Sequence, residues 1–340
     1  MGLGFKQSGF EIVGAWDWKQ HIVDSYAAHL GNHVKLQDIK ILTGLEVPDA
    51  EVWAFGFPCQ DLSRNGKMKG MTVKCTSCQL EFERTETQKI CPDCGCETYK
   101  AESRSGMFFE IMRLLGEVKR KPEIIVAENV YDLRKYLPAL EEEYEKAGYK
   151  AYIQLFDSKF WGVPQRRERF FVVGVRADID KGWFEFPKQG NEISKKLLDI
   201  LEGEVDDKFF NLSENVMSLL SLHPEGLRVR QATKQGYDIA KIGDSINVAH
   251  PKSKTRRGRV GKQIAQTLLT SPEQIVWLPD GRLRYLTPRE AARCQGFPDD
   301  FPQVVSDNHL YFQMGNAVTV NVARAVAESI KKFLECEVSK

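Results

Sequence analysis

The sequence lacks the features that mark membrane-bound and secreted proteins. No uninterrupted apolar stretch approaches the roughly 18 residues of a membrane-spanning helix, and the first residues show no charged-then-apolar signal pattern. These absences predict a soluble intracellular protein of the cytoplasm. Internal repeats and low-complexity tracts are also missing, which excludes repeat architectures and long disordered segments.

An excess of charge of one sign is missing too. The net charge is +1, so any binding of nucleic acid has to come from local clusters. The chain has 340 residues, of which 42% are hydrophobic and 28% charged, enough for one large folded domain and a smaller one. It has eight cysteines, which we expect to be reduced thiols because no secretory signal precedes them.

Apolar strand-like runs alternate with helical patterns between residues 10 and 176. The expected strands cover residues 12–16, 52–55, 123–127 and 170–175, and the expected helices cover residues 107–118 and 133–148. This alternation predicts an α/β fold, a Rossmann-like doubly wound sheet.

The rest of the chain divides the protein into further parts. We expect a catalytic domain over residues 1–187, interrupted by an insertion over residues 72–101. Residues 188–270 are expected to form a loop-rich recognition domain with many Gly, Pro, Ser and Asn residues. Residues 271–340 return to helical patterns and are expected to pack back on the catalytic domain.

Cys59 is the strongest candidate for catalysis. It lies in Gly56-Phe57-Pro58-Cys59-Gln60, directly after the apolar run of residues 52–55, which predicts a buried parallel strand. Glu128 comes directly after the next such run. Catalytic groups collect at the carboxyl ends of such strands, so a thiol and a carboxyl group are expected to face one crevice. Taken alone, Cys59 is equally compatible with a buried core cysteine.

A thiolate and a carboxylic acid suit the methylation of cytosine at C5. The thiolate adds to the electron-poor C6 and the acid protonates N3, which makes C5 nucleophilic. Positive charge that would favour the thiolate is available at Gln165-x-Arg167-x-Arg169. On a strand these three side chains point to one face, although a solvated basic turn gives the same pattern.

At this point the sequence resembles the DNA cytosine-5 methyltransferases. Five stretches match motifs of that family in order, namely Gly56-Phe57-Pro58-Cys59-Gln60, Glu128-Asn129-Val130, Gln165-x-Arg167-x-Arg169, Arg284-x-Leu286-Thr287-x-Arg289-Glu290 with Gln295-Gly296-Phe297-Pro298, and Gly315-Asn316-Ala317-Val318. The resemblance implies that Cys59, Glu128, Arg167 and Arg169 are catalytic. It also implies duplex DNA as the partner, a flipped-out target cytosine and association with the nucleoid.

The resemblance implies S-adenosylmethionine as cofactor. Asp17 would bind the ribose hydroxyls, and an acid at the end of a strand commonly does so. Trp18 would stack on adenine, although core packing explains a tryptophan equally well. The remaining implied contacts come from Asp38, Ile39, Pro58 and Asn316.

The sequence departs from the family at its beginning. Family members open with a strand that ends in a Phe-x-Gly-x-Gly loop, whereas residues 1–10 resemble the first helix, which comes after that loop. Loss of a central strand is expected to expose apolar edges and sheet backbone. Three interpretations stay open: an upstream segment supplies the strand, a second chain supplies it, or the protein binds cofactor poorly. Without such a partner we expect a monomer.

The insertion carries Cys75-x2-Cys78-x12-Cys91-x2-Cys94, which predicts a structural zinc site of the ribbon type. Cys96 is an alternative ligand. Four thiolates leave no open position, which argues against catalytic zinc. A cytidine deaminase would show Pro-Cys-x-x-Cys, and Leu62 occupies the place of its second cysteine.

Two further segments are expected to contact DNA. One is the loop after the catalytic cysteine, with Ser63, Arg64, Lys67 and, beyond the insertion, Arg104. The other is the run of residues 252–262, which has six cations and no acid. Its candidate residues are Lys252, Lys254, Arg256, Arg257 and Arg259. The alternative interpretation of this run is a solvated basic loop. For the protein as a whole, the alternatives are a non-catalytic DNA-binding relative and an enzyme that methylates RNA.

Overall fold

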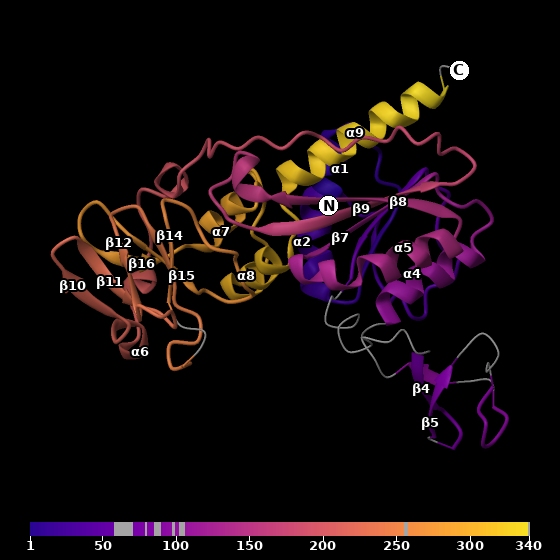
Figure 1. Ribbon diagram of the computed structural model, residues 1–340, viewed down its shortest axis with the longest axis horizontal. Helices are drawn as coiled ribbons and strands as arrows, with labels where there is room; N and C mark the ends of the chain where they lie inside the picture. Colours follow the sequence, from indigo (N-terminus) through magenta and orange to yellow (C-terminus); the bar gives the residue numbers. More distant parts are fainter. Residues whose placement is uncertain are drawn as a thin grey trace.

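The computed structural model describes residues 1–57, 71–78, 80–84, 90–96, 99–101, 106–254 and 258–338. A larger part built around a sheet lies at one side of the molecule and a smaller β-rich part at the other, with helices α7 and α8 between them (Figure 1). Helix α7 is Pro288–Cys294 and α8 is Asp307–Asn316.

The larger part contains a four-stranded sheet in the order β3-β7-β9-β8. The strands are β3 (Val52–Gly56), β7 (Ile124–Val130), β8 (Tyr149–Asp157) and β9 (Glu168–Arg176). Strands β3 and β7 are parallel, whereas β9 runs antiparallel to both of its neighbours. The apolar runs of β7 and β9 are buried because both strands are flanked on each side.

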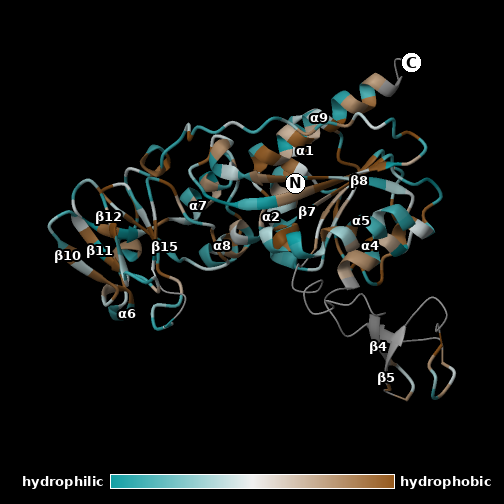
Figure 2. Ribbon diagram, viewed as in Figure 1, coloured by the Kyte–Doolittle hydropathy of each residue, from teal (hydrophilic) through white to brown (hydrophobic). Residues whose placement is uncertain are grey.

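Helices cover both faces of this sheet (Figure 1). Helices α4 (Gly106–Glu117) and α5 (Leu137–Lys146) pack on one face, around a core that includes Phe108 and Tyr144. Helices α1 (Gly2–Gln7) and α9 (Val320–Val338) pack on the other, around Phe5 and Val326. The apolar strands lie between the helices, whose outer faces are hydrophilic (Figure 2). These three layers bring the last helix of the chain against the first helix.

Two more parallel strands, β1 (Ala15–Asp17) and β2 (Val34–Leu36), form a separate pair that α2 (Gln20–Leu30) connects. Within the described residues, β3 pairs only with β7. The prediction of a buried strand at residues 52–55 is therefore wrong in one respect. Ala54 and Gly56 are exposed, because β3 is an edge strand.

The smaller part consists of two antiparallel sheets. One has the order β10-β11-β12 and the other β14-β13-β15-β16. The strands are β10 (Leu220–His223), β11 (Gly226–Arg230), β12 (Tyr237–Ala240), β13 (Ser245–Asn247), β14 (Arg259–Gly261), β15 (Gln274–Trp277) and β16 (Leu283–Tyr285). Both sheets and the short helix α6 (Glu214–Met217) share one apolar core. The second sheet crosses residue 270, where the sequence suggests a boundary.

A third, small sheet lies in the insertion, in the order β5-β4-β6. Its strands are β4 (Met71–Cys75), β5 (Glu81–Arg84) and β6 (Tyr99–Ala101). Short 3-10 turns occur at Tyr131–Tyr136, Ser158–Phe160, Leu197–Ile200 and Asp207–Phe210. None of the helices in the described ranges has the length and apolarity needed to cross a membrane.

Candidate active site

The two candidate catalytic segments leave the sheet side by side. Gly56, the last residue of β3, is the register partner of Glu128 on β7. Because the strands are parallel, the residues that come after both strands emerge at the same edge of the sheet. Pro58 and Cys59 lie outside the described residues, and the structure describes the chain to Phe57, two residues before the thiol.

Asn129 joins these two segments. Its side chain is buried and donates from Nδ2 to the carbonyl oxygen of Phe57 at 2.9 Å, while its Oδ1 accepts from the backbone of Val130 at 2.8 Å. The amide thus fixes the backbone just before Pro58 to the end of β7. The sequence analysis names Asn129 only as part of the Glu128-Asn129-Val130 motif. A polar residue this close to four buried apolar positions itself indicates a buried hydrogen-bonded group.

Glu128 holds a carboxylate oxygen that is buried and takes no hydrogen bond from any described residue. Its Oε1 lies 3.3 Å from Nε of Arg169, an ion pair whose angles do not make a hydrogen bond. Both side chains are mostly buried, at 11% and 15% exposed. A buried acceptor without a donor is uncommon in folded proteins and is typical of a site that receives a ligand.

The guanidinium of Arg167 bonds to backbone carbonyls of the C-terminal part. Its Nη2 donates to the carbonyl oxygens of Gly315 and Ala317 at 3.0 and 2.9 Å, and its Nη1 lies 3.5 Å from the carbonyl of Leu268. Burial, reinforced by the nearby Arg169 charge, lowers the pKa of Arg167 to about 9. Burial also lowers the pKa of Arg169, which the Glu128 charge opposes. Arg167 therefore positions the segment after α8, whereas Arg169 forms the ion pair with the candidate acid.

Gln165 also links distant segments of the chain, a role that the sequence analysis does not predict. It is fully buried, donates from Nε2 to the carbonyl of Cys294 at 2.9 Å and accepts from the backbone of Leu268 at 3.0 Å. It precedes β9, which begins at Glu168, and forms a bridge with Ala265. Gln165 and Arg167 together hold the C-terminal helices and the segment around residue 268 against the catalytic sheet.

The candidate cofactor residues Asp17, Trp18, Asp38 and Ile39 gather at the carboxyl ends of β1 and β2. Asp17 pairs in register with Leu36, and the backbone of Gln37 donates to the Asp17 carbonyl at 3.0 Å. Burial raises the pKa of the Asp17 carboxyl group. The Trp18 side chain is 65% exposed, which excludes the core-packing interpretation for this tryptophan.

Helix α8 borders the same region. The ammonium of Lys19 lies 3.8 Å from the ring centroid of Phe312, and Gln313 donates to the carbonyl of His21 at 2.7 Å. Asn316, the last residue of α8, is exposed and donates to the Phe312 carbonyl at 3.0 Å. The structure thus brings β1 and the end of α8 to one side. An exposed aromatic face beside two acids suits an adenosine, so these residues fit the nucleoside half of S-adenosylmethionine.

The cysteines of the insertion also converge. The sulfur atoms of Cys75, Cys78, Cys91 and Cys94 all lie within 4.8 Å of one another. Of the candidate DNA contacts, Lys252, Lys254 and Arg259 are exposed. Outside the described residues lie Pro58, Cys59, Ser63, Arg64, Lys67, Arg104, Arg256 and Arg257.

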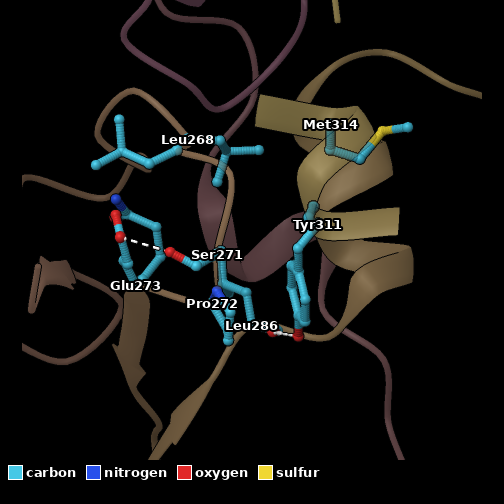
Figure 3. A pocket seen from close by; sticks show the side chains of 10 residues that line it. Leu268, Ser271, Pro272, Glu273, Leu286, Tyr311 and Met314 are labelled. Atoms are coloured by element: carbon cyan, nitrogen blue, oxygen red, sulfur yellow. Dashed lines mark hydrogen bonds between the residues drawn. The ribbon is translucent and has the colours of Figure 1, made fainter. Parts of the chain in front are cut away.

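A small cavity lies where the β-rich part meets α7 and α8 (Figure 3). It is lined by Leu268, Pro272 and Tyr311, among others, and its volume of about 10 Å³ is no more than one water molecule occupies. The amide of Gln274 at its border is 3% exposed and has no hydrogen-bond partner in the described part of the chain. The cavity is a packing feature and is too small for a nucleobase.

The helix-covered sheet, with a nucleoside-sized group of residues at the ends of β1 and β2, defines the S-adenosylmethionine-dependent methyltransferase fold. The sequence model of the C-5 cytosine-specific DNA methylase family matches residues 1–89 and 94–332. The chain therefore belongs to this family, whose members are DNA cytosine-5 methyltransferases.

Comparison with individual proteins agrees with this assignment. The chain is 29% identical to the type II methyltransferase M.NlaX of Neisseria lactamica, over 98% of this chain and 93% of the relative. It is 30% identical to the type II methyltransferase M.Bsp6I of Bacillus sp. (strain RFL6), over 98% and 95%. The Dnmt2 methyltransferase of S. pombe has the same fold, with a TM-score of 0.65 at 19% identity over 99% of this chain and 95% of that one. The predicted fold and family are both confirmed.

The Asn129 bridge gives a testable result. Asn129→Ala removes the donor to the Phe57 carbonyl, so the segment leading to Cys59 loses a fixed point. We expect kcat for methyl transfer to fall about ten- to a hundredfold with little change in KM for DNA, since misplacing a reacting group costs that much. Steady-state kinetics with labelled cofactor measures both constants. Equal losses in Gln154→Ala, at an exposed position of β8, would contradict the assignment.

Proposed function

We propose that the protein transfers a methyl group from S-adenosylmethionine to C5 of a flipped-out cytosine within a specific duplex DNA sequence. The observation that carries the proposal is the register of β3 and β7. This register sets Gly56, three residues before Cys59, beside Glu128, whose buried Oε1 takes no hydrogen bond from the described residues, and this supports a shared role for the two groups.

In the proposed reaction the Cys59 thiolate adds to C6 while Glu128 bonds N3 and the exocyclic amine of the base. Arg169, beside Glu128, holds the acid and the base in place, and Arg167 holds the segment after α8. S-adenosylmethionine, when bound, supplies the methyl group. A base then removes the C5 proton and elimination releases Cys59. The target must leave the duplex because C6 is unreachable inside the base stack.

Asp17, Trp18, Asp38, Ile39, Pro58 and Asn316 are the residues that would hold the cofactor. The described part of the chain supplies no glycine loop for its methionine end. One edge of β3 has no partner among the described strands and would accept one more strand, and we propose that a further segment or a second chain supplies it. When a further segment of the same chain supplies that strand, the protein works as a monomer, in the cytoplasm at the nucleoid.

The DNA would lie against the loop after Cys59 and against the β-rich part. The proposed contacts from the loop are Ser63, Arg64, Lys67 and Arg104, and those from the β-rich part are Lys252, Lys254, Arg256, Arg257 and Arg259. We propose residues 188–270 as the target-recognition domain, with β15 and β16 completing its second sheet. Type II relatives favour a role in restriction-modification, and protection of phage DNA uses the same chemistry.

A transfer assay with methyl-labelled cofactor tests the proposal. The 340-residue chain is incubated with mixed-sequence duplex DNA and, in a second arm, with structured RNA. Label in acid-stable 5-methylcytosine of DNA is expected. No label in either arm, with weak cofactor binding by calorimetry, would favour an impaired DNA-binding relative, and label in RNA alone would overturn the DNA assignment.

We further propose that the four cysteines of the insertion bind one structural zinc ion. The sulfurs of Cys75 and Cys94 are 3.4 Å apart, and those of Cys78 and Cys91 are 3.5 Å apart. Thiolates around a tetrahedral zinc, each about 2.3 Å from the metal, stand roughly 3.8 Å apart. All four thiols are free of disulfides. The sulfur spacing therefore suits a metal ion.

The backbone at the two Cys-x2-Cys pairs supports the same site. The N–H of Cys75 donates to the carbonyl of Leu80, and the N–H of Cys91 donates to that of Cys96, both at 2.9 Å. Each pair thus closes a similar short turn. The backbone of Ser77 also donates to the Cys75 sulfur, at 3.4 Å. Donors that converge on thiolates stabilise their negative charge.

Metal analysis of the reduced, purified protein checks this site. We expect one zinc per chain, and its loss in the double variant Cys78→Ser/Cys91→Ser, because two remaining thiolates do not hold the ion. Cys336→Ser, at an exposed position of α9, is the matched control and should keep the zinc. Metal-free wild-type protein, or zinc retained by the double variant, would refute the proposal.

A further inference from the structure

Strand β11 presents two arginines to solvent. Along the strand, Leu227 and Val229 point into the core, whereas Arg228 and Arg230 are exposed on the opposite face. The alternation arises from the two-residue repeat of a strand. Strands β10, β11 and β12 lie at the end of the β-rich part that is farthest from the catalytic sheet (Figure 1).

The neighbouring positions on this face are aromatic or uncharged. Arg228 is the register partner of Ser221 and Ile239, and Arg230 is that of Tyr237. The guanidinium carbon of Arg228 lies 4.2 Å from the Tyr237 ring centroid, so a cation–π contact orders this side chain without neutralising it.

The acid of β12 does not neutralise these arginines. Asp238 is the register partner of Val229 and therefore belongs to the other face, where its Oδ1 lies 3.5 Å from Nζ of Lys262. Lys262 also lies 3.7 Å from Asp244. One cation of the basic run is thus paired with acids of the β-rich part. In the described part of the chain, Arg228, Arg230 and Arg259 form no ion pair.

The basic run touches β11 at Arg230. Gly258 has a φ of +51°, and a side-chain carbon added there would lie 2.3 Å from the Arg230 carbonyl oxygen. Only glycine allows this close approach. The next residue, the exposed Arg259, begins β14, and β14 packs against β12. Arg259 therefore follows directly on the residue that contacts the Arg230 backbone, so this end of the basic run lies next to β11.

We propose that Arg228 and Arg230, together with Arg259, form a surface that binds the phosphates of duplex DNA. This inference rests on the proposed function and extends it to residues outside the basic run. Exposed guanidiniums without acidic partners bind phosphate bidentately and release counterions from the duplex. Phosphate contacts set affinity and register and do not read the sequence.

Salt dependence of binding tests this surface. Fluorescence anisotropy is measured with a mixed-sequence 30-base-pair duplex (a length of about three helical turns) between about 50 and 200 mM salt. In the double variant Arg228→Gln/Arg230→Gln we expect several-fold weaker binding and a log–log salt slope that is smaller by about 1 to 2. The single variants should each lower the slope by about 1 or less. The matched control is Arg282→Gln, because Arg282 already pairs with Asp280 at 2.7 Å.

The outcomes separate this inference from the function on which it rests. An unchanged slope in the double variant, in protein that still methylates DNA, would overturn the surface and leave the proposed function intact. A wild-type protein that neither binds nor methylates duplex DNA would sink the proposed function instead. A slope change seen only with an RNA duplex of equal length would replace DNA by RNA as the partner of this surface.

Discussion

Cys59→Ser is expected to abolish methyl transfer while the protein keeps its affinity for duplex DNA. A serine hydroxyl is a far weaker nucleophile than a thiolate at neutral pH, and loss of a covalent nucleophile lowers kcat by about 10³-fold or more. Binding should persist because phosphate contacts supply most of the affinity. Labelled-methyl transfer and anisotropy, run on the same preparation, measure the two quantities separately.

A second cysteine substitution gives the control. Cys336→Ser changes an exposed thiol on α9 and should leave both activity and DNA binding unchanged. Trapping of the covalent adduct tests the same mechanism in a different way. A duplex that carries 5-fluorocytosine should form a denaturation-resistant adduct with the wild type and with Cys336→Ser, but not with Cys59→Ser. Near-normal methylation by Cys59→Ser would end the covalent mechanism.

Glu290→Ala is expected to lower the free energy of unfolding by about 3–5 kcal/mol. Glu290 is fully buried and Arg284 is 2% exposed, and the carboxylate accepts two hydrogen bonds from the guanidinium at 2.7 and 2.8 Å. It also accepts from the backbones of Thr287 and Glu202, at 2.8 and 2.7 Å. Removing it leaves a buried cation without a counter-ion and two backbone amides without their acceptor. Chemical denaturation measures the loss.

Two further variants show whether the buried charge is the cause. Glu328→Ala breaks a surface pair with Arg324 on α9 and should change stability by no more than about 0.5 kcal/mol. The double variant Arg284→Met/Glu290→Met removes both charges and should be more stable than Glu290→Ala, because no unpaired ion remains. The opposite order of stability would mean that packing, and not charge, accounts for the loss.

The sequence predicts those parts of the candidate site that lie at the ends of strands. Cys59 and Glu128 each come after an apolar run in the sequence, and the register of β3 and β7 sets Gly56, three residues before Cys59, beside Glu128. The two arginines were not separable from sequence. Alternation predicts one face for Arg167 and Arg169, yet Arg169 meets Glu128 whereas Arg167 turns to the carbonyls of Gly315 and Ala317. That difference depends on residues 315–317, which lie far along the chain from either arginine.

Other parts of the site depend on contacts that no local pattern records. The Asn129 bond to the Phe57 carbonyl, and the meeting of Lys19 with Phe312, each join residues far apart in the sequence. The edge position of β3 likewise depends on contacts between distant segments. An apolar run predicts a buried strand, but burial of both edges requires a neighbouring strand on each side.

The sequence by itself determined the family, the order of strands and helices around Cys59 and Glu128, and the thiol spacing of the insertion. Those features are local, because periodicity and short spacings act within one segment of backbone. Only the tertiary structure decided which guanidinium reaches the acid, which cation of the basic run pairs with acids and that both arginines of β11 are exposed. These features depend on packing between segments that are distant in the sequence, because the tertiary fold sets which side chains are buried and which charges pair.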